Sequence, residues 1–183
     1  MDDDRQLVLA LRRGEPDAFD ELYRRHHERI WRFLSRLAGN GAEDLFQDTW
    51  LAAARHARLL REDTALLPWL FTVARNKHRN ARRFGVFDYR RKEALAASTP
   101  FLPEQAEEAA LARIQAERVN LAFARLPEAF REVLLLCSVE GMESPEAARV
   151  LGISPEAVRK RLSRARAELA QSLGMDVEAG GKP

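Results

Sequence analysis

The sequence SPEAARVLGISPEAVRKRLSRARAEL, residues 144–169, predicts two short helices joined by a tight turn. Ser144 and Ser154 are each followed by proline, and we expect them to be N-caps because serine caps a helix and proline fits its first turn. Gly152 can take the left-handed conformation that ends a helix. Ala148, Gly152 and Val158 have helix-turn-helix spacing: a small residue at the crossing, a turn, and a β-branched residue beneath the second helix.

The second of these helices has an apolar and a basic face. Its apolar stripe is formed by Val158, Leu162, Ala165 and Leu169. On the opposite face lie Arg159, Lys160, Ser163, Arg164 and Arg166. Arginine can donate two hydrogen bonds to a guanine edge or a phosphate, and a short serine permits close approach to DNA. Residues 159–166 hold no acidic side chain. A surface helix that only faces water would be expected to pair its basic residues with acidic ones at i,i+4, so we favour contact with DNA over a solvated surface.

The N-terminal half, residues 5–83, is expected to be helical. Its apolar residues recur every three or four positions, and no stretch alternates as a strand would. We expect a short helix that ends before Gly14 and a long helix with Asp17 as its N-cap. A third helix is expected from about residue 42, followed by a loop over residues 61–67. Pro68 is then expected at the first position of a fourth helix.

The regular pattern lapses between residues 82 and 104, where Pro100 and Pro103 disfavour a helix. Helices are expected again at about residues 104–125 and from Pro127 onward. The predicted fold class is therefore all-α, with two small domains, an N-terminal helical bundle and a C-terminal helix-turn-helix, joined by a flexible linker. We place the first domain at residues 1–88, the linker at 89–110, the second domain at 111–174 and a tail at 175–183.

Charge is distributed unevenly along the 183 residues. Thirty basic residues almost balance 28 acidic ones, but residues 71–92 hold eight basic side chains against Asp88 alone. Aromatic and amide side chains are interleaved there, a mixture that suits unpaired bases, which stack on aromatic rings and bond to amides. For Trp69 and Phe71 a place in the core is an equally good interpretation.

Other chemistry is disfavoured by the composition. Cys137 is the one cysteine, so an internal disulfide is impossible, a reducing cytoplasm is the expected location, and its apolar neighbours favour a core residue. His26 and His27 precede Glu28, but a zinc-binding HExxH motif would need histidine where Trp31 stands. The acidic N-terminus is unlike a secretory signal and no apolar run reaches membrane-spanning length. We therefore expect no metal, no cofactor, no membrane insertion and no enzymatic activity.

The third helix starts with acidic residues, including Glu43, Asp44 and Asp48. The helix dipole favours carboxylates at this end, which by itself explains them. An acidic surface beside two basic ones also suits a protein that docks on a positively charged partner while it holds DNA.

Three blocks in this order carry a family resemblance: AEDLFQDTWLAAARH at 42–56, PWLFTVARNKHRNARR at 68–83, and LPEAFREVLLLCSVEGMESPEAARVLGISPEAVRKRLSRARAEL at 126–169. Together they resemble the bacterial extracytoplasmic-function, or group IV, sigma factors of RNA polymerase. The resemblance spans both domains, and the chain is too short for the extra domains of a housekeeping sigma factor.

The resemblance implies roles for particular residues. Core-polymerase binding, on the clamp helices of the largest subunit, falls to Asp44, Leu45, Gln47 and Asp48, with Asp48 where glutamate is common. Recognition and melting of the minus-10 element falls to Asn76, which matches the family's asparagine, and less firmly to Trp69, Arg75, Lys77, Arg79 and Asn80. Recognition of the minus-35 element falls to Arg159, Lys160, Ser163, Arg164 and Arg166.

The implied function is that of an alternative sigma factor that directs core polymerase to specific promoters and initiates transcription. Its expected partners are core RNA polymerase, including the flap region, promoter DNA and an anti-sigma factor. The alternative is a two-domain DNA-binding transcriptional regulator that works without polymerase. Such a regulator would bind duplex DNA tightly by itself, whereas a sigma factor should need core polymerase.

Overall fold

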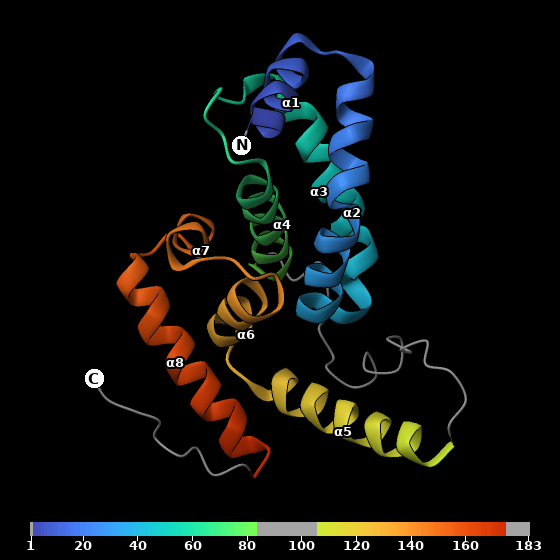
Figure 1. Cartoon of the computed structure of the whole chain (residues 1–183), viewed down its shortest axis with the longest axis vertical. Helices are drawn as coiled ribbons and strands as arrows, with labels where there is room; N and C mark the ends of the chain where they lie inside the picture. Colours follow the sequence, from blue (N-terminus) through green and yellow to red (C-terminus); the bar gives the residue numbers. More distant parts are fainter. Residues whose placement is uncertain (1, 84–105, 175–183) are drawn as a thin grey trace.

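The computed structural model describes residues 2–83 and 106–174, with side chains described for residues 4–83 and 113–174, and every regular element in these ranges is helical (Figure 1). Residues 89–105 of the expected linker, residues 89–110, lie outside the described residues. The expected tail, residues 175–183, lies wholly outside them.

The N-terminal part is a bundle of four α-helices with two short 3₁₀ turns. Its elements are α1 (Asp2–Arg13), α2 (Pro16–Ala38), η1 (Gly39–Gly41), α3 (Ala42–His56), η2 (Ala57–Leu59) and α4 (Leu66–Arg83). α2, α3 and α4 pack against one another, and α1 closes one end against α2 and η2. Phe33 of α2 and Phe71 of α4 meet edge to face at the centre, with ring centroids 5.1 Å apart, and both are almost fully buried.

The C-terminal part contains the expected helix-turn-helix. Its elements are α5 (Ala106–Arg125), α6 (Glu128–Leu134), the π-helical turn η3 (Leu135–Val139), α7 (Ser144–Leu151) and α8 (Pro155–Ser172). Gly152 has φ 68° and ends α7, and the Ser154 hydroxyl accepts a hydrogen bond from Ala157 N at 3.1 Å. The left-handed turn and the second cap are thus confirmed.

Three helix starts differ from the sequence expectation. α2 has Glu15 at its N-cap with Pro16 following, so Asp17 lies inside the first turn. α7 is capped by Glu143, which forms a capping box with Glu146, rather than by Ser144. α4 starts at Leu66, two residues before the proline. The shifts are small because proline is tolerated throughout the first helical turn, where no backbone donor is needed.

The two helical domains predicted from sequence are confirmed, and they pack against each other. α4 lies against α7, and α2 contacts α6 (Figure 1). Buried apolar residues of both parts form one continuous cluster that runs from α1 to α8. No helix in the described parts of the chain is long and apolar enough to cross a membrane.

Candidate nucleic-acid and polymerase interfaces

The five α8 residues expected to face DNA lie together on its exposed side. Val158 and Ala165 of the apolar stripe are fully buried, and α8 packs through this stripe side on α6 and α7. On the other side, Arg159, Lys160, Ser163, Arg164 and Arg166 are all exposed. The arrangement leaves arginine forks and a short hydroxyl accessible on one face, which is the chemistry needed for contact with phosphates and base edges.

Contrary to the sequence expectation, one basic residue of this face has an i,i+4 ion-pair partner. Lys160 Nζ pairs with Glu156 Oε1 at 2.7 Å, an i,i+4 ion pair with an acidic residue that lies just before residues 159–166. Both side chains are about two-thirds exposed, so the pair contributes little stability and competes weakly with a phosphate. Arg166 also has a partner, since Nη2 donates to the Ser138 hydroxyl at 3.2 Å.

The minus-10 candidates on α4 divide between two faces. Asn76, Arg79 and Asn80 are exposed. Arg75 is instead buried, with 9% exposure: Nε donates to Glu132 Oε1 at 2.8 Å and Nη1 donates to the Val150 carbonyl at 3.2 Å. In this arrangement Arg75 does not face solvent, so the structure brings only part of the expected set together.

Lys77 and the two aromatic residues of α4 have other surroundings. Lys77 Nζ lies 3.7 Å from Asp48 Oδ2 on α3, which joins a minus-10 candidate to a polymerase-binding candidate. Phe71 is fully buried, which confirms its core interpretation. Trp69 is half-buried and packs against the core.

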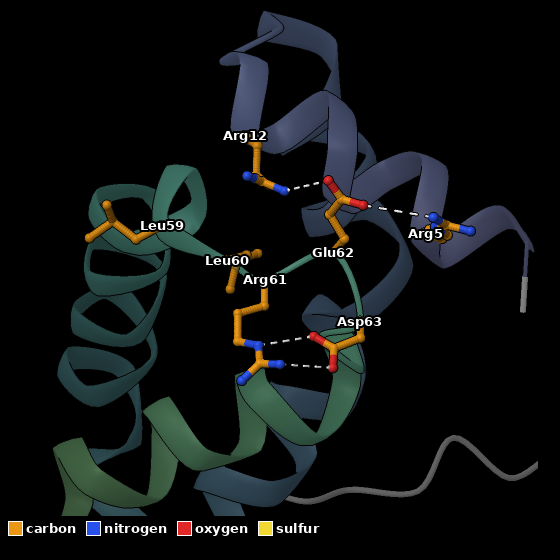
Figure 2. A pocket seen from close by; sticks show the side chains of 7 residues that line it. All are labelled: Arg5, Arg12, Leu59, Leu60, Arg61, Glu62 and Asp63. Carbon is orange, nitrogen blue, oxygen red and sulfur yellow. Dashed lines mark hydrogen bonds and ion pairs between the residues drawn. The ribbon is translucent and has the colours of Figure 1, made fainter.

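A hollow of about 740 Å³ lies beside the loop that precedes α4 (Figure 2). It is lined by Arg5, Arg12, Leu59, Leu60, Arg61, Glu62 and Asp63. Glu62 Oε1 accepts a hydrogen bond from Arg12 Nη1 at 2.9 Å, and its other oxygen lies 3.7 Å from Arg5 Nη2. Arg61 pairs with Asp63 within the loop, with Nε 3.1 Å from Oδ1. Ion pairs to α1 therefore tie the loop to the bundle.

The acidic start of α3 is an exposed surface with one buried exception. Asp44, Gln47 and Asp48 are exposed, whereas Leu45 is 2% exposed and belongs to the core. Leu45 therefore supports this surface from beneath.

Sequence reasoning missed the aromatic residues beside the acidic surface. Trp31 and Tyr23 are 44% and 38% exposed. Trp31 packs edge-on against Phe46 at 5.5 Å between centroids, and Tyr23 against Trp50 at 4.8 Å. A signal was present, because Trp31 falls off the stripe of Ile30, Leu34 and Leu37 on which α2 packs.

His26 and Cys137 are both partly buried, and burial shifts the pKa of each toward its neutral form. Burial lowers the pKa of His26, which favours the neutral ring of a histidine packed in the bundle. Cys137 is half-buried against the core, and burial raises the pKa of its thiol, which makes it a poor nucleophile. Among the described side chains, no three histidine, cysteine, aspartate or glutamate residues gather as a metal site would require.

Known proteins match both parts of the chain. Residues 22–85 match the family model described as Sigma-70 region 2, and residues 116–169 match Sigma-70, region 4. The RNA polymerase sigma factor CarQ of Myxococcus xanthus is 34% identical over 168 residues, which cover 90% of this chain and 94% of CarQ. The ECF RNA polymerase sigma factor SigM of Mycobacterium tuberculosis is 31% identical over 174 residues, which cover 93% and 85% of the two chains. The chain belongs to the extracytoplasmic-function sigma factors.

A solved structure agrees with this membership. The sigma factor CnrH, in complex with the cytosolic domain of CnrY, has a TM-score of 0.70 and 30% identity to this chain, and the match covers 94% of this chain and 98% of CnrH. The protein is therefore an RNA polymerase sigma factor, and a regulator that works without polymerase is not supported. The relatives are sigma factors, which are not enzymes in the usual sense.

Proposed function

We propose that this sigma factor is a cytoplasmic, non-enzymatic subunit that uses three separate surfaces, one for polymerase and two for promoter DNA. Residues 1–88 form the polymerase-binding and minus-10 domain, residues 111–174 form the minus-35 domain, and residues 89–110 link them. The observation that carries the proposal is the exposed face of α8, where five DNA-competent side chains lie opposite an apolar stripe whose Val158 and Ala165 are fully buried.

The α8 face reads minus-35 duplex from the major groove. Ser163 lies one helical turn from Arg159 and next to Arg164, so a short hydroxyl is flanked by long guanidinium groups. The arginines can reach guanine edges and phosphates while the serine lets the backbone approach. Each phosphate contact neutralised adds close to one unit to the salt dependence of binding, so affinity should fall steeply as salt rises.

The exposed face of α4 and the loop before it act on the minus-10 element. Asn76 and Asn80 offer amides at i,i+4 and Arg79 lies between them, a pattern suited to hydrogen bonds with unpaired bases and contact with the backbone. The hollow beside the loop is a place for a flipped base. Stacking is worth about 1–3 kcal/mol per base and offsets an unpairing cost of a few kcal/mol.

The exposed part of α3 docks on core polymerase. Asp44, Gln47 and Asp48 supply charge and hydrogen bonds, and Trp31 supplies apolar area beside them. Tryptophan is enriched at protein interfaces and often carries a large share of the binding energy. Basic residues on the clamp helices of the largest subunit are the matching partner, and the flap region would receive the C-terminal domain.

Restraint by an anti-sigma factor completes the proposal. CnrH was solved in complex with the cytosolic domain of CnrY, and a structural neighbour from Bartonella quintana, RpoE, in complex with the anti-sigma factor NepR. We infer that a comparable partner covers the polymerase-binding surface of this chain.

Transcription reconstituted from purified core polymerase tests the proposal. Promoters are first identified as the transcripts induced by overexpression, and each is then transcribed with and without this protein. We expect transcription only with the protein, and expect Asn76→Ala to slow strand opening while minus-35 duplex binding is unchanged. Equal transcription with and without the added protein, on every fragment, would refute the proposal.

A further inference from the structure

Three carboxylates of the C-terminal domain face cations of the N-terminal domain. They are Glu128 and Glu132 on α6 and Glu140 just after η3, hereafter the carboxylate row. Each meets at least one basic side chain of α2 or α4 across the domain boundary. Interfaces between linked domains are polar and usually permit relative motion, so these ion pairs must break if the two domains separate.

The central pair, Glu132 with Arg75, is the most deeply buried. The side chains are 4% and 11% exposed, and Glu132 Oε1 lies 2.8 Å from Arg75 Nε. A second bond from Arg75 reaches the Val150 carbonyl at 3.2 Å, so α4 is tied to α6 and to α7 through one guanidinium. Removing either charge would leave the other buried and uncompensated while the domains stay packed, so loss of Glu132 should favour separation of the domains, which returns Arg75 to water.

Glu140 forms the second contact, with α2. Its side chain is 1% exposed, Oε2 accepts from Arg29 Nε at 2.7 Å, and Arg32 Nη1 lies 3.5 Å from Oε1. Arg29 Nη2 also donates to the Glu140 carbonyl at 2.7 Å. On the same side, Arg131 Nη1 donates to the Leu37 carbonyl at 3.2 Å, so the end of α2 is held from two residues of the C-terminal domain.

Glu128 forms the third contact, at the C-terminal half of α4. It pairs with Arg82, and its Oε1 lies 3.4 Å from His78 Nδ1. Burial and the nearby Arg82 lower the pKa of His78 to about 4, so the ring is neutral at physiological pH. The charge that meets Glu128 is therefore that of Arg82.

The carboxylate row occupies cations that DNA would also use. Arg75 and Arg82 belong to the basic helix α4, which also carries the exposed Asn76, Arg79 and Asn80. Carboxylate and phosphate are competing anions for the same guanidinium, because both accept paired hydrogen bonds in one plane. While Arg75 is bound to Glu132, one side of α4 is closed to the DNA backbone.

We propose that the carboxylate row is an internal substitute for the DNA backbone, which holds the two domains closed and masks one side of α4 until the chain opens on polymerase. The proposal rests on the assignment of α4 to the minus-10 element. Opening exchanges Glu132 and Glu128 for phosphates at Arg75 and Arg82, so these two arginines remain paired in both states, whereas Glu140 releases Arg29 and Arg32 of α2 to water. A partner that separates the domains then shifts the population toward the DNA-competent state.

The experiment uses the full-length chain with Cys137→Ser and one dye each on cysteines placed at Gln6 and Gln171, which are exposed on α1 and α8. The test variant carries Glu128→Gln, Glu132→Gln and Glu140→Gln. The control variant removes the same charge from exposed positions of the same domain, with Glu117→Gln, Glu156→Gln and Glu168→Gln. Energy transfer between the dyes reports closure, and circular dichroism reports that each variant is folded.

We expect the test variant to lose energy transfer and to bind a mixed-sequence single-stranded oligonucleotide about tenfold more tightly than the control, since masking lowers apparent affinity by the open fraction. A reversed pair, Arg75→Glu with Glu132→Arg, should regain the transfer that Glu132→Arg alone loses. Unchanged transfer in the folded test variant overturns the proposal, and so does opening without tighter DNA binding than the control. Failure of promoter-dependent transcription would instead refute the sigma-factor surfaces while energy transfer still reports the closed state.

Discussion

Replacing Gly152 with alanine tests the turn on which the helix-turn-helix depends. Gly152 has φ 68°, and a Cβ there would meet no atom within 4 Å. The substitution therefore adds left-handed strain without a clash, and we expect it to lower the free energy of unfolding by about 1–2 kcal/mol. Gly14 is a useful contrast, because at φ 72° its added Cβ would lie 2.6 Å from Arg58 Nη2 and would also displace that side chain.

Urea unfolding followed by circular dichroism measures the change. Gly152→Asn should lose less stability than Gly152→Ala, because asparagine tolerates the left-handed region. Binding of the folded variant to a minus-35 duplex should stay within about twofold of the unsubstituted protein, which is about 0.4 kcal/mol, since the face of α8 is unaltered. An unchanged unfolding free energy, or a loss above about 3 kcal/mol, would refute the reasoning.

The local environments of Asp44, His78 and Cys137 lead to three further predictions. Asp44→Arg reverses an exposed charge and should weaken core-polymerase binding at least about tenfold in titrations. Asp20→Arg, exposed on α2, is the control, and an equal loss of binding in both variants would contradict the docking surface. The pKa of His78 is about 4 in the folded protein and 6.5 in the unfolded chain, so its contribution to stability is present above pH 6.5 and is lost as the pH falls toward 4. The free energy of unfolding should fall by about 2 kcal/mol between pH 7 and 5 for this reason. If His78→Gln keeps the full pH dependence in urea titrations, His78 is not the cause. Because burial raises the pKa of Cys137, its alkylation should be slow at neutral pH and accelerate in urea, and equal rates would show an open thiol.

The helix-turn-helix was predictable from sequence because local rules determine it. A left-handed glycine at 152 and a cap at Ser154 act within a few residues of themselves, so their signals are visible in a short stretch. Helix starts were less certain, because glutamates at 15 and 143 occupy the cap positions where Asp17 and Ser144 were expected. Caps compete over neighbouring residues, and small differences in free energy decide among them.

The position of Arg75 could not be predicted in the same way. Its place in a basic run indicated DNA contact, whereas its partner Glu132 is 57 residues away in the chain. Sequence pattern shows that a helix is basic but not which of its faces another domain covers. Leu45 illustrates the same limit, since its family match indicated polymerase binding while packing places it in the core. Residues whose role depends on contacts between domains therefore need the structure.

The π-helical turn η3 determines the direction in which Glu140 points. An α-helix advances about 100° per residue, so an unbroken helix would direct Glu140 about 80° away from Glu132. The bond from Glu140 N to Leu135 O, 2.9 Å long, encloses one extra residue, so Glu140 instead lies within about 20° of the direction of Glu132. The extra residue is thus absorbed by the π-turn, which keeps Glu140 in phase with Glu132. Deletion of one residue inside η3 would place Glu140 seven residues after Glu132, about 20° from it in a regular α-helix, so the deletion should restore the α-helix with Glu140 still directed toward α2.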